Sequence, residues 1–295
     1  MTDPNLAHSS SLLQGPPVID LSARAKWKLT GADRIRYLNG QTTNDIIKLP
    51  EGHACRAAIL DAKGRFQGEI MVAKSAEALW IDGPAELREP LGLRLERYII
   101  ADDATLEDVT DRWNLLHFRP PPTVSDDMAF ASSRYLEPGT DCWLPATSPL
   151  PPASPEAEAE PLRILRLLPA WDREIDPSTL VPEVLYDRLG TSYTKGCYIG
   201  QEVVARLKSI GRVNRELRLL RTSTAPTREP PFDLERDGAP AGRLTSLATD
   251  PTTGTAIALG IIARAHLDPG TRLVGGETTW EVQALPGFDI SATPG

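Results

Sequence analysis

Cysteine is scarce in this chain, and its distribution excludes two common roles. The 295 residues include three cysteines, Cys55, Cys142 and Cys197, which lie far apart in the sequence. An odd and scattered set does not form the paired framework of small secreted proteins, and it contains no C-x-x-C metal pattern. We therefore expect a protein of a reducing compartment, with the cytoplasm as the default location.

Long apolar runs are also missing. No window of the sequence approaches the roughly 20 apolar residues that a membrane-spanning helix needs. The first residues, "MTDPNLAHSSSLLQGPP", lack the basic start and the apolar stretch of a signal peptide. We expect neither a secretion signal nor a membrane partner.

Basic residues are fewer than acidic residues. The net charge is -8 at pH 7, with 40 acidic and 32 basic residues. A protein that grips nucleic acid broadly needs a basic surface, so we expect no nucleic-acid partner. Hydrophobic residues make up 41% of the chain and charged residues 24%, which is the balance of a globular protein with a sizeable core.

The first half of the chain has patterns of both strands and helices. Residues 18–30 alternate in the manner of one strand, and a short helix follows, which Asn39 and Gly40 are expected to stop. Residues 55–72 read as a hairpin around a turn at 61–64, because apolar runs flank that turn. These patterns favour a mixed α+β fold.

The sequence pattern changes in the second half of the chain. A proline-rich stretch, 148–161, is expected to form an exposed linker. After residue 212, short apolar runs alternate with Pro, Gly and Asp at regular spacing, which is typical of a small antiparallel barrel or sandwich. We place a domain boundary near residue 210.

One segment bears on chemistry most directly. In "YTKGCYIGQEVVARL", 193–207, Cys197 lies near Lys195 and just before an amphipathic helix. Free N–H groups at a helix start and a nearby ammonium group both favour the thiolate form. Cys197 is therefore a candidate nucleophile, redox-sensitive thiol, or single ligand of a metal or cluster. The alternative is a small buried residue, since free cysteines are usually buried.

The segment "KGCYIGQEVVAR", 195–206, resembles the signature of the YgfZ/IBA57 family, relatives of the glycine-cleavage T-protein. Two further stretches are similar to family segments, "TGADRIRYLNGQTTNDI" at 30–46 and "LDAKGRFQGEIMV" at 60–72. The sequence "GRLTS", 242–246, is similar to a strand of the family's C-terminal barrel. The resemblance covers most of the chain outside the proline-rich stretches.

The resemblance implies an α+β fold, with a T-protein-like body around a central channel and a small C-terminal antiparallel β-barrel. On this basis we expect the body to span residues 1–210 and the barrel to span 211–295. The body would contain two sublobes, one formed by residues 1–50 with 160–210, and the other by residues 51–159.

The resemblance also implies a function. Proteins of this family act in the assembly or repair of iron–sulfur clusters, and their channel accepts tetrahydrofolate. We therefore expect a reduced folate as the cofactor, and iron–sulfur client or assembly proteins as partners. Cys197 is expected to be the functional thiol, with Lys195 beside it. It would hold a cluster only transiently, and no fixed metal site is expected.

The family segments also supply the expected contacts to folate. These are Gly196, Tyr198, Gly200, Gln201, Glu202, Arg206, Asn44 and Glu69. Other roles are open for several of them. Tyr198 is a candidate anchor of the loop in the core, and Gln201 and Glu202 are candidate caps of the helix. Arg206 either pairs with Glu202, four residues earlier, or faces the channel.

Two departures from the family pattern bear on the reaction. Aminomethyltransferases carry an Asp pair that helps to activate the folate nitrogen, whereas this chain has "QGE" at 67–69. The alternative function, a folate-dependent aminomethyl transferase or demethylase, therefore requires Glu69 to replace that acid. In addition, Leu168 stands where relatives have a glutamate that faces the pterin. Glu174 or Glu183 would then have to take over its pairing with the pterin.

Overall fold

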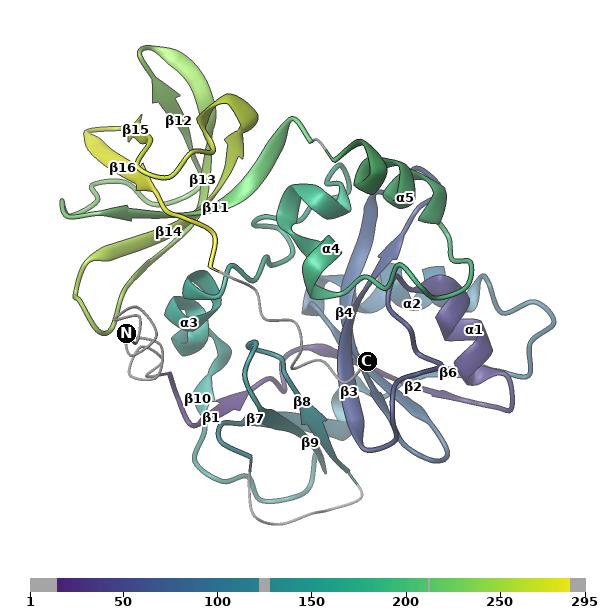
Figure 1. Ribbon diagram of the computed structural model, residues 1–295. Helices are drawn as coiled ribbons and strands as arrows, with labels where there is room; N and C mark the ends of the chain where they lie inside the picture. Colours follow the sequence, from purple (N-terminus) through teal and green to yellow (C-terminus); the bar gives the residue numbers. More distant parts are fainter. Residues whose placement is uncertain (1–14, 122–127, 212, 287–295) are drawn as a thin grey trace, which may run out of the picture.

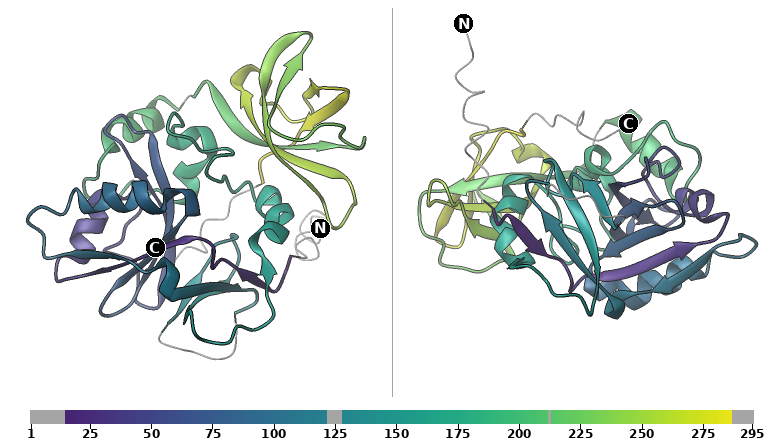
Figure 2. Two further views of the ribbon diagram at one scale, coloured as in Figure 1. Left: turned by 180° about the vertical axis from the view of Figure 1, so that it is seen from behind. Right: turned by 90° about the horizontal axis from the view of Figure 1, so that it is seen from below.

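The computed structural model describes residues 15–121, 128–211 and 213–286. The protein has two parts, a body built on a large sheet and a closed barrel formed by the C-terminal strands (Figure 1). Views from behind and from below show the barrel attached at one side of the body (Figure 2). The expected α+β fold with a small C-terminal barrel is confirmed.

The sheet of the body contains ten strands. They are β1 (Val18–Asp20), β2 (Ala25–Thr30), β3 (His53–Leu60), β4 (Phe66–Lys74), β5 (Leu79–Gly83), β6 (Thr105–Asp108), β7 (Trp113–Phe118), β8 (Ala129–Ser132), β9 (Gly139–Pro145) and β10 (Ser154–Pro155). Their order is β10-β1-β7-β9-β8-β3-β4-β5-β2-β6. Strands from both expected sublobes join this one sheet, and the division of the body into sublobes stays a prediction.

Residues 18–30 form two strands, so the expectation of a single strand is wrong. Between β1 and β2, the N–H of Ser22 donates to the side chain of Asp20 at 2.8 Å. The N–H of Arg24 donates to the carbonyl oxygen of Leu21 at 3.0 Å. Asp and Ser side chains favour such local turns, and this one sends the two strands to distant places in the sheet.

The predicted hairpin is confirmed, with β3 and β4 paired antiparallel. Its turn is closed by the N–H of Gly64, which donates to the carbonyl oxygen of Asp61 at 3.0 Å. The side chain of Asp61 also accepts from the N–H of Arg65 at 2.9 Å. The hairpin supplies two long neighbouring strands on which candidate site residues lie.

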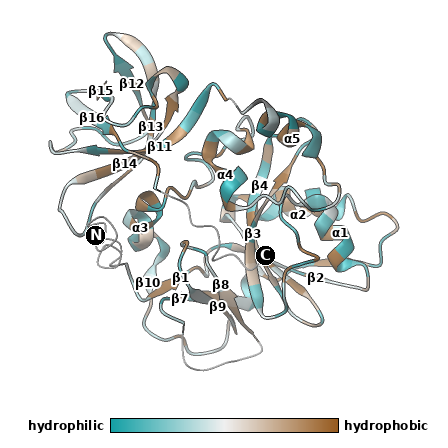
Figure 3. Cartoon of the chain, viewed as in Figure 1, coloured by the Kyte–Doolittle hydropathy of each residue, from teal (hydrophilic) through white to brown (hydrophobic). Residues whose placement is uncertain are grey.

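The described residues form five α-helices. They are α1 (Arg34–Gln41), α2 (Arg88–Glu96), α3 (Glu160–Leu165), α4 (Tyr186–Leu189) and α5 (Gln201–Ile210). The expected helix stop at Asn39 and Gly40 is wrong, because α1 continues to Gln41. The side chain of Asn39 accepts from the N–H of Ile46 at 3.0 Å and holds the next turn instead. In Figure 3, α1 and α5 carry both hydrophilic and hydrophobic residues, as expected of helices with one face on the core.

Apolar cores lie on both faces of the sheet. Ile70 and Val72 of β4 enter one core, whereas Met71 and Ala73 enter the other. Successive side chains of a strand point to opposite faces, so this alternation shows that the centre of the sheet is covered on both sides. α1 and α2 cover the face that holds Ile70 and Val72.

The C-terminal strands close into a barrel. They are β11 (Arg215–Thr222), β12 (Phe232–Arg236), β13 (Ala239–Thr249), β14 (Ala256–Ala263), β15 (Arg272–Gly275) and β16 (Thr278–Val282). Their order is β11-β14-β13-β12-β15-β16, and the described pairings are antiparallel, as predicted. The domain boundary near residue 210 stays a prediction, and the first barrel strand begins at Arg215.

The body and the barrel share an apolar contact. Ile164 of α3 and Leu185 pack with Leu217 and Leu259 of the barrel. The proline-rich stretch 148–161 is mostly exposed, as expected of a linker, but it also contains β10 and the start of α3. The end of this stretch therefore places α3 against the barrel, where the two cavities described below meet.

Candidate functional site

The thiol of Cys197 lies on the surface, in the loop before α5. Its neighbour Gly196 is also exposed, and a side-chain carbon added there would meet nothing within 4 Å. Cys55 is different, because it is buried and burial raises the pKa of its thiol to about 12. Cys142 is of intermediate exposure, so Cys197 is the most exposed of the three thiols.

Lys195 is buried, and its ammonium group binds the end of α1. The Nζ atom donates to the carbonyl oxygens of Asn39, Thr42 and Asn44, each at 2.6 Å. Burial lowers the pKa of Lys195 to about 8. These contacts fasten the Cys197 loop to α1, and an influence of Lys195 on the thiol of Cys197 stays a prediction.

The residues after Cys197 fix the loop to the body. Tyr198 is 8% exposed and packs with Leu60 and Phe66, as expected of an anchor in the core. Gly200 has a φ of +86°, and an added side-chain carbon would lie 2.6 Å from the carbonyl oxygen of Asp61. Glycine is therefore required for α5 to begin this close to the hairpin turn.

Three further motif residues lie on α5. Gln201 is the first residue of the helix, and Gly200 precedes it as the N-cap without a side-chain hydrogen bond. The interpretation of Gln201 and Glu202 as caps is therefore wrong. Glu202 and Arg206 are exposed, and no ion pair joins them in the part of the chain that the structure describes.

A cavity of about 290 Å³ lies in the body, where β3 and β4 meet the segment around α3. We call it the central cavity. Its wall contains two positions noted in the sequence, Glu69 and Leu168. The other charged or aromatic residues that line it are Arg24, Arg56, Arg134, Tyr135, Glu156, Glu160, Arg163 and Arg173. Leu168 is 2% exposed and belongs to the apolar core, so its side chain offers no acceptor to a ligand.

Glu69 offers a free acceptor atom in the central cavity. Its Oε2 atom accepts from a guanidinium N–H of Arg56 at 3.2 Å, and no described residue donates to its Oε1 atom. Arg56 also donates to the carbonyl oxygen of Arg134 at 2.8 Å. Asn44 does not line this cavity. Its side-chain amide donates to the carbonyl oxygen of Arg56 at 2.8 Å. Asn44 thus supports the strand that carries Arg56.

A buried network of ion pairs extends from the wall of the central cavity, where Arg24 and Arg134 lie, into the body. Arg134 donates to Asp82 at 2.6 and 3.0 Å and to Asp141 at 2.9 and 3.2 Å. Arg24 donates to Asp82 at 2.6 Å, and Nδ1 of His117 lies 2.7 Å from Asp141. Burial opposes the ionisation of Asp141, but Arg134 and His117 hold the pKa of its carboxyl well below the usual range. No motif in the sequence indicates this network, because its members come from separate segments.

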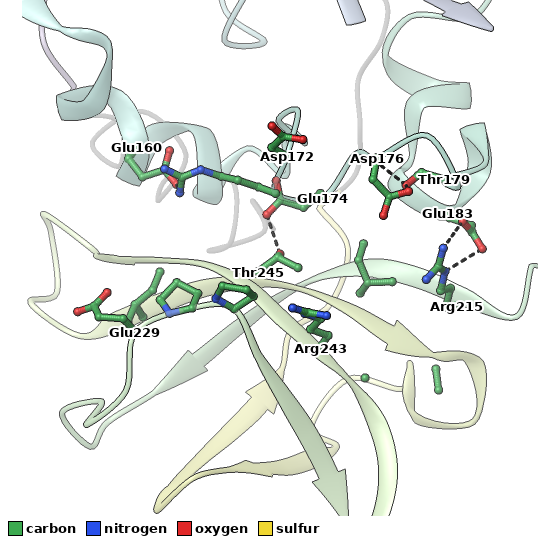
Figure 4. Close-up of a pocket in the computed structure, with 17 residues that line it drawn as sticks. Glu160, Asp172, Glu174, Asp176, Thr179, Glu183, Arg215, Glu229, Arg243 and Thr245 are labelled. Carbon is green, nitrogen blue, oxygen red and sulfur yellow. Dashed lines mark hydrogen bonds and ion pairs between the residues drawn. The ribbon is translucent and has the colours of Figure 1, made fainter. Parts of the chain in front are cut away.

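A larger cavity, of about 810 Å³, lies between the body and the barrel (Figure 4). We call it the interface cavity. Glu174 and Glu183 line it and do not line the central cavity. Glu183 accepts from Arg215 of the barrel at 3.0 and 3.1 Å, and Glu174 accepts from Thr245 at 2.7 Å and from Ser246 at 2.6 Å. Both carboxylates therefore join the body to the barrel, so neither replaces the missing glutamate in the central cavity.

The two cavities share a wall. Glu160 and Arg173 line both of them, and their side chains form an ion pair at 2.9 Å. Cys197 and Lys195 line neither cavity. The candidate residues are thus divided between the surface loop before α5 and the wall of the central cavity. Contacts of the loop residues with a ligand stay a prediction.

The described residues contain neither a metal-binding cluster nor a membrane-spanning helix. Among them, no group of three or more His, Cys, Asp or Glu side chains is arranged to hold a metal ion. The same part of the chain contains no helix that is both long and apolar enough to cross a membrane. The interpretation of Cys197 as a transient ligand of a cluster stays a prediction.

No family model matches the chain, but curated relatives do. The chain is 25% identical over 292 residues to the "tRNA-modifying protein YgfZ" of Escherichia coli O6:H1, covering 88% of this chain and 89% of the relative. A protein of the same name from Shigella boydii serotype 18 is 27% identical over 237 residues, with 70% and 72% covered. A putative chloroplastic transferase of Arabidopsis thaliana is 26% identical over 308 residues, with 89% and 69% covered.

A solved structure has a similar fold. It is the glycine cleavage system aminomethyltransferase T from Bartonella henselae, and the TM-score is 0.79. The match covers 93% of this chain and 87% of that protein. The two chains are 15% identical, so this likeness shows the fold alone. The chain is thus similar to the YgfZ proteins over most of its length, and it has the fold of the glycine-cleavage aminomethyltransferase.

Proposed function

We propose that this chain is a folate-binding accessory protein, which takes a reduced folate into the central cavity and presents Cys197 to protein partners. The observation that carries the proposal is the free Oε1 atom of Glu69, in a cavity that is otherwise rich in arginine. It provides a carboxylate acceptor in the cavity even though Leu168 replaces the glutamate of relatives.

The chemistry of a pterin fits this acceptor. A buried pterin presents an amino group and a ring N–H, and both need a hydrogen-bond acceptor. Glu69 is 6% exposed and is held in place by Arg56, so its free oxygen has a fixed position. Leu168 and the ring of Tyr135 add apolar surface for a flat ring.

The tail of a folate suits the edge of the same cavity. Small-molecule sites have volumes of about 300–1,000 Å³. The central cavity, at about 290 Å³, lies just below this range, so it is proposed to hold the pterin ring while the tail of the folate lies outside it. The tail ends in carboxylates, which guanidinium groups bind well. The side chain of Arg173 is 49% exposed and lines the cavity. One of its N–H groups donates to Glu160, and the others are the proposed partners of the tail.

Cys197 is proposed to act on a different molecule. Its thiol is exposed and lies outside the lining of the central cavity, so the group that it meets is carried by a partner protein. We assign it to the assembly or repair of iron–sulfur clusters in client enzymes, with the cluster as cargo. Relatives are named for tRNA modification. The net charge of -8 disfavours a direct grip on tRNA, so an effect on tRNA would pass through the enzymes that modify it.

Titration of the purified protein with tetrahydrofolate tests the binding proposal. Isothermal calorimetry should show binding, and Glu69→Gln should weaken it about tenfold or more, because a charge-assisted hydrogen bond is lost. Glu51→Gln is the matched control, since Glu51 is exposed and lies outside the central cavity. Absence of binding to the wild type, or equal affinity in Glu69→Gln, contradicts the proposal.

Complementation tests the role of Cys197. In a strain that lacks the gene, the wild type should restore the activity of iron–sulfur enzymes, and Cys197→Ser should not. Cys142→Ser controls for the loss of a cysteine elsewhere in the chain. Full restoration by Cys197→Ser would rule out the assigned role of the thiol.

A second candidate function is folate-dependent aminomethyl transfer, which the free oxygen of Glu69 also favours. This reaction needs a carboxylate close to the folate nitrogen. If the protein is such an enzyme, incubation with tetrahydrofolate and an aminomethyl donor forms methylenetetrahydrofolate and releases ammonia, and Glu69→Gln abolishes both products. Absence of product with the wild type excludes this candidate while leaving the binding proposal intact.

A further inference from the structure

The interface cavity has the features of a ligand site, although neither Cys197 nor Glu69 is part of it. Its volume of about 810 Å³ falls within the range of small-molecule sites, about 300–1,000 Å³. Leu247 and Ile261 of the barrel and Pro231 give it apolar surface. Charged side chains enter from both the body and the barrel (Figure 4).

Most of the charged groups in this wall already have partners. Glu183 is paired with Arg215, and Glu160 is paired with Arg173. The side chain of Glu174 is fully buried and accepts from Arg163 at 2.8 Å. These pairs balance the charges of their members, and the pair of Glu183 with Arg215 also joins the body to the barrel.

Arg243 of β13 is the exception on the barrel side. It stands directly opposite Asp233 in the pairing of β12 with β13, a position that favours an ion pair between the two strands. No ion pair joins Arg243 to Asp233 or to any other described residue, and Arg243 lines the cavity instead. A guanidinium group without a carboxylate in a cavity wall is suited to bind a carboxylate of a ligand.

Asp172 is the matching exception on the body side. Figure 4 shows it across the cavity from Arg243. It has a φ of +60°, and its N–H donates to the carbonyl oxygen of Ile175 at 2.9 Å, so a tight turn holds it in place. Its carboxylate forms no ion pair within the described residues. Among the described residues of the lining, Arg243 is thus a cation without an ion pair, and Asp172 is an anion without one that faces it. Asp176 and Glu229 also line the cavity without an ion pair, but Asp176 accepts hydrogen bonds from Ser178 and Thr179.

We propose that the interface cavity is a second ligand site, and that its ligand is a zwitterion, either a free amino acid or a short peptide. Its carboxylate binds Arg243 and its ammonium group binds Asp172. A ligand with only negative charge would be repelled by Asp172 and by Glu229, another carboxylate of the wall that has no ion pair. A ligand with only positive charge would leave Arg243 unpaired. A molecule with both charges gives both Arg243 and Asp172 a partner, and the volume of the cavity leaves room for the side chains of the ligand.

Calorimetric titration with the common amino acids and with alanyl dipeptides tests this proposal. At least one of them should bind, and blocking either end should weaken its binding about tenfold or more. In C-amidated forms the carboxylate is lost, and in N-acetylated forms the ammonium group is lost. Arg243→Gln should weaken the binding of the unblocked ligand and leave the binding of the C-amidated form unchanged. Asp172→Asn should weaken the binding of every form that has an ammonium group and leave the binding of the N-acetylated form unchanged.

Asp233→Asn is the matched control, because Asp233 faces Arg243 in the sheet but does not line the cavity. It should leave binding unchanged, and thermal melts should show that all three variants are folded. The proposal is overturned if no amino acid or dipeptide binds at millimolar concentration, or if the blocked forms bind as well as the free ones. The outcome is independent of folate, since Glu69→Gln should not alter binding in this cavity.

Discussion

The ammonium nitrogen of Lys195 lies 2.6 Å from the carbonyl oxygen of Asn39, in the last turn of α1. This contact joins two of the segments that resemble family motifs, which are far apart in the sequence. The carbonyl groups of the last helical turn have no partner within the helix, and a buried ammonium group supplies one here. The lysine of the motif therefore has a structural role that is independent of the nearby thiol.

Replacement of Lys195 by methionine should destabilise the protein. The change leaves the buried carbonyl oxygens of Asn39 and Thr42 without their donor, which should lower the free energy of unfolding by about 2–4 kcal/mol. Urea denaturation at neutral pH measures this difference. Lys48→Met is the control, because Lys48 is 62% exposed and its ion pair spans 3.8 Å, so the expected change is below about 0.5 kcal/mol. Equal stability of the two variants would contradict the structural role.

Two glycines of the motif should respond differently to alanine. Gly200 has a positive φ, and an added carbon would lie 2.6 Å from the backbone of Asp61, so Gly200→Ala should cost about 2–4 kcal/mol. Gly196 is exposed and has open space around it, so Gly196→Ala should change stability by less than about 0.5 kcal/mol. Parallel urea titrations compare the two. A large loss in Gly196→Ala would show that the loop has a different conformation.

Much of the fold could be predicted from local patterns. The hairpin at 55–72 follows from its apolar runs and its turn residues, and the barrel follows from short strands at regular spacing. The helix stop at Asn39 was wrong, because the residue's side chain binds the N–H of Ile46. That contact lies beyond the helix, so a rule about local backbone preference does not detect it.

The site was harder to predict than the fold. The motif identified Cys197 and placed it correctly before a helix. It did not reveal that Arg24, Arg134 and Asp141 come together near the central cavity, because these residues lie on separate segments and no periodicity links them. Contacts of this kind depend on the order of strands in the sheet, which one sequence does not specify.

The stability that the buried network contributes should depend on pH through Asp141. Arg134 and His117 hold the pKa of Asp141 below its ordinary value of 3.8, although burial opposes this. A depressed carboxyl pKa contributes stability that is complete above the unfolded value and is lost as the pH falls through the folded value. Asp141→Asn should therefore cost about 3–5 kcal/mol at neutral pH.

The cost of Asp141→Asn should shrink as the pH falls below 3.8 toward the depressed pKa of the native protein. Urea titrations of both proteins from neutral pH down to about pH 3 measure this change. The exposed Asp233 provides the control, because Asp233→Asn should follow the wild type throughout. A difference that stays constant with pH would mean that Asp141 is not ionised in the native protein.

Thiol labelling should distinguish the reactivity of the cysteines. At mildly alkaline pH, a thiol reagent should modify Cys197 rapidly, because it is exposed, and Cys55 only on unfolding, because it is buried with a raised pKa. Cys197→Ser should remove the rapid phase, and Cys142→Ser should keep it. Rapid labelling that survives Cys197→Ser would place the reactive thiol elsewhere.

Saturating tetrahydrofolate should leave the rapid phase of labelling unchanged. Cys197 does not line the central cavity, so a folate bound there does not cover its thiol. The measurement is the rate of labelling with and without folate, under conditions where calorimetry shows saturation. Protection of Cys197 by folate would place the thiol and the ligand in one site, and it would contradict the assignment of the thiol to a partner protein. An unchanged rate would support the proposal that the folate site and the thiol of Cys197 lie in separate places.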